Sequence, residues 1–200
     1  MAGSVCHAVA ADATGLTRQL QLHVCQIFPS QECCGIYQWP QGNSSKELPW
    51  LQVLVFLCRD SGVYTFVSSG ASRIKDGPGF GLEFCMQSRV LSDYMIELVV
   101  MAAYMHSLPD HRLDVGHCLR IGRPMGEGSG LSHLLVSLPY PLGPDFEYVH
   151  ADGEHIRILW LLPIFPSEVD VLMRDGVEVL EEIFDDKEID FLDFERTAVV

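Results

Sequence analysis

The strongest constraint on this fold is the nearly continuous apolar run from Ile156 to Leu162, which only Arg157 interrupts. A strand with one solvated face alternates apolar and polar residues, whereas a strand covered on both faces is apolar at consecutive positions. We therefore predict a central, buried sheet strand over His155–Ile164, with a second buried strand over His133–Leu138.

The other elements follow from the spacing of apolar residues and from turn signals. We predict helices over Thr14–Phe28 and Leu91–Met105, and strands over Leu51–Cys58, Val63–Val67, Phe80–Gln87 and Val115–Ile121. Two stretches rich in Gly, Pro and polar residues, Ser30–Pro49 and Pro139–Gly153, are predicted to be loops. Strands interspersed with few helices indicate one α+β domain with a mostly antiparallel sheet and flanking helices.

Two helices are predicted after Pro166. The first has Ser167 as its N-cap and Gly176 as its C-terminal cap. Its inward residues are predicted to be Val169, Leu172 and Met173. The second helix turns Val177, Leu180, Ile183 and Phe184 inward and Glu178, Glu181 and Glu182 outward.

The chain is strongly acidic, with 13 Lys and Arg against 27 Asp and Glu and a net charge of −14. The segment from Glu168 to Arg196 carries twelve of these acids against three basic residues, a net charge of −9. Such a field repels phosphate backbones and attracts basic proteins. We therefore expect a protein partner and no nucleic acid.

The sequence predicts a cytoplasmic protein. No apolar run approaches the roughly 20 residues that a membrane-spanning helix needs, and Met1–Ala13 lacks the basic residues that begin a signal peptide. The seven cysteines are an odd count. In a reducing compartment we expect them to be reduced and unliganded.

No motif for catalysis, cofactor binding or metal binding stands out, so we predict no catalytic residues, no cofactor and no metal. His106, His111, His117 and Cys118 match zinc spacings only loosely, and surface histidines are the commoner explanation. One enzymatic alternative remains open. A cysteine-dependent hydrolase would use Cys33 or Cys34 beside a histidine.

Several stretches of this sequence occur together in an order and spacing typical of one protein family. They are Val63–Ser72, Gly81–Phe84 before the Leu91–Met105 helix, His133–Tyr140, and Ile158–Ile164 followed by Ser167-Glu168, Gly176 and Asp193-x-x-Arg196. In this arrangement Pro49–Thr197 resembles the suppressor-of-fused domain family. The closing stretch Leu192–Arg196 departs from the family by lacking a proline after Asp193. We therefore divide the chain into a helix-and-loop extension, 1–48, and a suppressor-of-fused-like domain, 49–200.

The resemblance implies a domain that binds proteins and has no catalytic residues. In animals the namesake restrains zinc-finger transcription factors, and similar short bacterial domains are encoded beside polymorphic toxins as immunity proteins. A chain of 200 residues resembles the short bacterial type. The resemblance to the bacterial type implies an immunity protein that neutralises a toxin. A regulatory scaffold protein that has no toxin partner is another alternative.

The acidic C-terminal helix is the predicted docking surface for the partner. Charges on a rigid helix make a better electrostatic target than the same charges on a loose tail. The predicted partner-binding residues are Glu178, Glu181, Glu182, Asp185, Asp186 and Glu188. The alternative surface is the loop Pro139–Gly153, and the other interpretation of the acidic face is that it only keeps the protein soluble.

Overall fold

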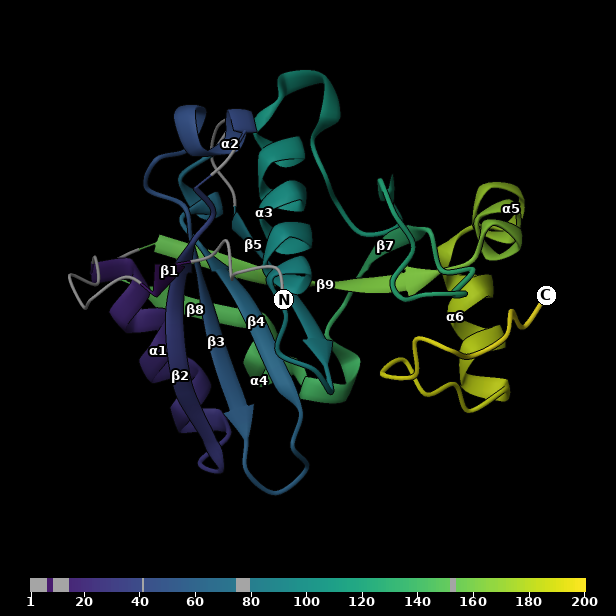
Figure 1. Cartoon of the computed structure of the whole chain (residues 1–200), viewed down its shortest axis with the longest axis horizontal. Helices are drawn as coiled ribbons and strands as arrows, with labels where there is room; N and C mark the ends of the chain where they lie inside the picture. The colour runs from purple at the N-terminus through teal and green to yellow at the C-terminus, as the bar shows by residue number, and fades with distance from the viewer. Residues whose placement is uncertain (1–6, 9–14, 41, 75–79, 152–153) are drawn as a thin grey trace. The chain divides into compact units, whose positions relative to one another are not determined.

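The computed structural model describes residues 7–8, 15–40, 42–74, 80–151 and 154–200. The chain forms two compact units (Figure 1). Unit 1 comprises Met1–Arg112 and Leu138–Leu159, and unit 2 comprises Leu113–Ser137 and Trp160–Val200. The predicted division at residue 48, between an extension and a suppressor-of-fused-like domain, stays a prediction.

Unit 1 is built on a sheet whose strands run in the order β1-β2-β3-β4-β5-β9, with β8 also paired to β9. The strand pairs from β1 to β5 are antiparallel, as is the pair of β8 and β9. The strands of this unit are β1 His7–Ala8, β2 Gln31–Gln38, β3 Gln52–Cys58, β4 Tyr64–Ser69, β5 Gly81–Ser88, β8 Tyr148–Ala151 and the first part of β9 Glu154–Ile164. Its α-helices are α1 Gly15–Ile27, α2 Gly42–Glu47, α3 Asp93–Ser107 and α4 Pro144–Glu147. Short 3₁₀ turns occupy η1 Ala71–Arg73, η2 Pro109–His111 and η3 Tyr140–Leu142.

Unit 2 contains the end of β9, from Trp160 to Ile164, which pairs antiparallel with β7, His133–Ser137. In turn β7 pairs antiparallel with β6, Cys118–Arg120. The helices α5 Pro166–Asp175 and α6 Val177–Asp186 follow β9 and pack against each other.

The predicted central strand is confirmed. From Ile158 to Leu162 no side chain of β9 is more than 4% exposed, although the apolar residues are consecutive. Leu134, Leu135 and Val136 of β7 are also fully buried. The fold class is α+β with a mostly antiparallel sheet and flanking helices, as predicted.

Both predicted loops were wrong in part. Within Ser30–Pro49, β2 pairs with β3 in a register that sets Ile36 opposite Leu54, and the register shifts between Cys33 and Gly35. This irregularity, and side chains that are mostly only half-buried, remove the alternation by which a strand is recognised.

Within Pro139–Gly153 the chain forms η3, α4 and β8. The prolines do not prevent regular structure there, because Pro144 occupies the first position of α4, where no backbone N–H is required.

The start of α5 also differs from the prediction. The N-cap is Phe165, with Pro166 as the first helical residue, so Ser167 lies inside the helix. Val171 is 5% exposed and faces the core, whereas Met173 is 77% exposed and does not. Gly176 ends α5 with a φ of 94°, a conformation that glycine adopts without strain.

A buried carboxylate organises the turn after β4 in unit 1. Glu83 is fully buried and accepts hydrogen bonds from the backbone N–H groups of Gly70, Ala71 and Ser72 and from the hydroxyls of Ser68 and Ser72. Gly70 has a φ of 115°, in the left-handed region. These donors replace the water that the carboxylate loses on burial.

A second buried carboxylate holds the C-terminal segment of unit 2. Glu168 is fully buried and binds the guanidinium of Arg196, whose Nη1 and Nη2 donate over 2.6 and 2.8 Å. Arg196 also donates to the Pro163 carbonyl, and its guanidinium lies 4.9 Å from the ring centre of Phe165. Because the backbone N–H of Phe165 donates to Glu168 as well, one ion pair joins the end of β9, the start of α5 and residue 196.

We predict that Arg196→Met destabilises unit 2 by about 3–5 kcal/mol, because it leaves the buried Glu168 carboxylate without its cation. The matched control is Arg174→Met, since Arg174 pairs with Asp175 at the surface and exposed ion pairs contribute at most about 1 kcal/mol. Urea unfolding followed by circular dichroism measures both changes. Equal losses in the two variants would contradict a structural role for the buried pair.

Candidate protein-binding surfaces

The acidic residues of α6 lie opposite its buried face. Leu180 and Phe184 are at most 2% exposed and fix the helix to unit 2. Five of the six predicted docking residues are exposed, and we call them the acidic surface. They are Glu178, Glu182, Asp185, Asp186 and Glu188.

Glu181 differs from the other predicted docking residues. It is half-buried, and the Ser137 hydroxyl of β7 donates a hydrogen bond to its carboxylate. This bond joins α6 to the sheet of unit 2. The prediction that Glu181 points outward was therefore wrong. The helical period places this residue at the edge of the buried face, next to Leu180.

The acidic surface keeps its charge despite the ion pairs of unit 2. Between residues 177 and 188 there are six acids and one basic residue, Lys187, which gives a net charge of −5. Glu168 and Arg196 cancel each other in the interior. Arg174 pairs with the adjacent Asp175. A basic molecule approaching α6 therefore meets a local excess of carboxylates.

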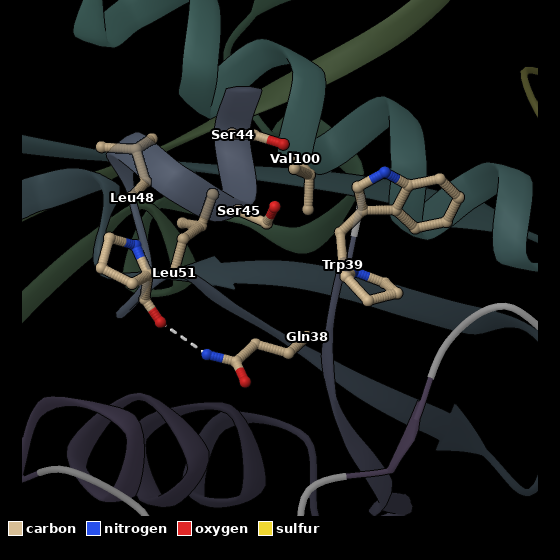
Figure 2. A pocket seen from close by; sticks show the side chains of 9 residues that line it. Gln38, Trp39, Ser44, Ser45, Leu48, Leu51 and Val100 are labelled. Atoms are coloured by element: carbon tan, nitrogen blue, oxygen red, sulfur yellow. Dashed lines mark hydrogen bonds between the residues drawn. The ribbon is translucent and has the colours of Figure 1, made fainter. Parts of the chain in front are cut away.

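Unit 1 contains a pocket of about 310 Å³ where the end of β2 meets α2 and α3 (Figure 2). Its lining residues are Gln38, Trp39, Pro40, Ser44, Ser45, Leu48, Pro49, Leu51 and Val100. The Gln38 side chain donates from Nε2 to the Pro49 carbonyl over 2.6 Å. This bond links β2 to the segment that leads into β3. No pattern in the sequence pointed to the pocket, since it draws on three separate segments.

The environment of Cys33 and Cys34 does not favour a nucleophile. Burial raises the pKa of the Cys33 thiol, and burial is also the largest cause of the raised pKa of Cys34. Their thiols donate to the carbonyls of Gly35 and Val55. A catalytic thiol needs the opposite shift, because the thiolate is the nucleophile.

Among the cysteines that the structure describes, Cys58 has a lowered pKa. The hydroxyl of Ser61 is the main cause, with backbone and Ser30 hydrogen bonds adding to it. The Ser30 hydroxyl lies 3.7 Å from the Cys58 sulfur.

The histidines of the loose zinc pattern have different surroundings. His106 is buried with its ring edge-on to Phe84, at 5.5 Å between centroids. His111 is exposed. His117 is exposed too, and its Nδ1 accepts a hydrogen bond from the Asp114 backbone over 3.1 Å. Within the described part of the chain, no group of three or more His, Cys, Asp or Glu residues is placed to hold a metal ion.

The helices of the described residues are all too short or too polar to span a membrane.

Residues 48–197 match the model of the Suppressor of fused protein (SUFU) family. A solved SUFU homologue from Neisseria gonorrhoeae FA 1090 is 31% identical, with a TM-score of 0.78 over 92% of this chain and 96% of that one. Drosophila Suppressor of Fused shares 12% identity at a TM-score of 0.62, covering all of this chain and 54% of that chain, and so shows the fold alone.

Two further comparisons concern interactions and immunity. A chain of the Sufu–Fu complex shares 13% identity at a TM-score of 0.58 over 94% of this chain and 93% of that one, which again shows the fold alone. Among curated proteins, the immunity protein YqcF of Bacillus subtilis is 27% identical over 70 residues, which are 35% of this chain and 36% of that protein. The match therefore spans about a third of either protein.

The thiol environments predict an order of alkylation in the native protein. Because its lowered pKa increases the thiolate fraction, Cys58 should react with iodoacetamide before Cys33 and Cys34 at pH 7.5. Mass spectrometry of digests taken during the reaction measures this order, and Cys58→Ser should remove the fast phase. If Cys33 or Cys34 were modified fastest, the prediction would be contradicted, and the alternative function as a cysteine-dependent hydrolase would be supported.

Proposed function

This chain belongs to the Suppressor of fused protein family, and from that premise we propose that it works by binding another protein and not by catalysis. The surroundings of its two buried carboxylates, Glu83 and Glu168, support this proposal. Glu83 and Glu168 have the burial that a catalytic carboxylate often has, but each is saturated by hydrogen bonds inside its own unit. Neither is among the residues that line the pocket.

The more specific proposal is that the chain is an immunity protein that neutralises a polymorphic toxin in the cytoplasm. Its partial similarity to the immunity protein YqcF supports this function. The net charge of −14 also suits a toxin whose active domain is basic, because opposite charges accelerate association and raise specificity.

The acidic surface is the docking site in this proposal. One observation carries it: Leu180 and Phe184 anchor α6 while the five carboxylates of the acidic surface stay exposed. Glu181, the sixth predicted residue, contributes charge but is tied to Ser137, so we assign it to positioning α6.

Co-expression tests the immunity function. The chain is produced together with the toxin domain encoded beside its gene, and we expect it to restore growth and to co-purify with the toxin. A toxin from an unrelated system serves as the control and should still kill. Growth that is not restored, or a genome with no toxin gene beside this one, would favour a regulatory scaffold instead.

Neutralising part of the acidic surface should slow association. In the variant Glu182→Gln, Asp185→Asn, Asp186→Asn we expect a lower association rate constant and a weaker dependence on salt, because exposed charges mainly steer encounter. The free energy of unfolding should change by no more than about 0.5 kcal/mol for each substitution. Stopped-flow fluorescence across a range of salt concentrations measures the rate.

The matched control changes the same charge elsewhere. Glu32, Asp60 and Asp110 are exposed carboxylates of unit 1 outside both candidate docking surfaces, and their conversion to Gln or Asn also removes three negative charges. If only the overall charge matters, both triple variants slow equally. An unaffected rate in the α6 variant would place the docking site elsewhere, with 139–153 as the next surface to test.

A further inference from the structure

The pocket of unit 1 has apolar buried walls and a rigid rim. Leu48, Leu51 and Val100 are 4–5% exposed and line its interior. Pro40 and Pro49 are exposed and lie at its mouth. Figure 2 shows the Trp39 indole on the side opposite Leu48 and Leu51. Rings at the mouth lose little conformational entropy on binding, because they have few rotatable bonds.

The polar groups of the pocket are all uncharged. Among the side chains they are the hydroxyls of Ser44 and Ser45, the amide of Gln38 and the indole N–H of Trp39. The nearest charged residues of α2, Lys46 and Glu47, are exposed and are not among the lining residues. A charged group that entered this pocket would lose its hydration without gaining a counter-ion, which is costly. The pocket therefore selects a neutral, largely apolar occupant.

The volume of about 310 Å³ limits the size of that occupant. It is at the lower end of the roughly 300–1,000 Å³ found for ligand pockets. One large side chain with its adjoining peptide groups fits this volume. The neutral hydroxyls and amide at the pocket can form hydrogen bonds with those peptide groups.

We propose that this pocket receives one uncharged aromatic or branched aliphatic side chain of the protein partner. The inference rests on the proposed protein-binding function and adds an apolar anchor to the charge attraction of the acidic surface. Steering charges raise the association rate, whereas an anchor in a desolvated pocket mainly lowers the dissociation rate.

The test uses an amino-acid probe and does not need the partner. N-acetyl-phenylalaninamide is titrated into the ¹⁵N-labelled chain, with N-acetyl-lysinamide as the charged counterpart. We expect saturable shifts of the backbone amides that line the pocket, with a dissociation constant on the order of 1 mM for a probe of this size. The lysine probe should shift these amides far less.

Two variants alter the pocket in opposite ways. Ser44→Phe fills it from α2, and Trp39→Ala removes one wall, so both should weaken binding of the phenylalanine probe about tenfold or more. Tyr140→Ala is the matched control, because it removes a ring that is 61% exposed elsewhere in unit 1. The dispersion of the same spectra reports whether each variant is folded.

Shifts that persist in folded Ser44→Phe, equal responses to both probes, or no saturable shift at all would overturn the proposal. These outcomes leave the protein-binding function itself standing, since co-expression with the toxin tests that function separately. Conversely, a chain that binds the phenylalanine probe but fails to protect against the toxin would retain the pocket and lose the immunity function.

Discussion

The buried pair of Glu168 and Arg196 is the interaction on which the arrangement of unit 2 depends. A carboxylate without solvent exposure is tolerable only when its charge is neutralised and its oxygens accept hydrogen bonds. Arg196 supplies the charge, and Phe165 and Val199 add backbone donors. The segment after α6 is thereby tied to the start of α5, and α6 is held between two fixed ends with the acidic surface outward.

Unit 1 also contains a buried carboxylate, which is stabilised without a cation. Glu83 is satisfied by backbone and hydroxyl donors from residues 68–72. Gly81 is needed for this close approach, because a Cβ at that position would lie 2.6 Å from the Ser72 carbonyl oxygen. Much of the sequence that resembles the family thus encodes two internal polar contacts, which explains how a recognisable signature coexists with no catalytic motif.

The sequence predicted what depends on local residue patterns. The strand over Ile156–Leu162 was identified because its apolar residues are nearly consecutive, and the inward residues Leu180 and Phe184 of α6 because apolar residues recur there at the helical period. The strand β2 was missed because its register shifts near Gly35 and its side chains do not alternate in burial. The docking role of the predicted acidic residues stays a proposal, and the bond between Ser137 and Glu181 was invisible because the two residues lie 44 positions apart. The pocket of unit 1 could not be predicted either, because its lining residues come from separate segments of the chain.

We propose that the chain binds a protein through the acidic surface and the pocket, while its buried carboxylates serve only the fold. Hydrogen–deuterium exchange, comparing the free chain with its complex, distinguishes these roles. We expect slower exchange on binding at 177–188 and at 38–51, and unchanged exchange at 68–72. Protection confined to 139–151, with α6 and the pocket segments unaffected, would contradict it.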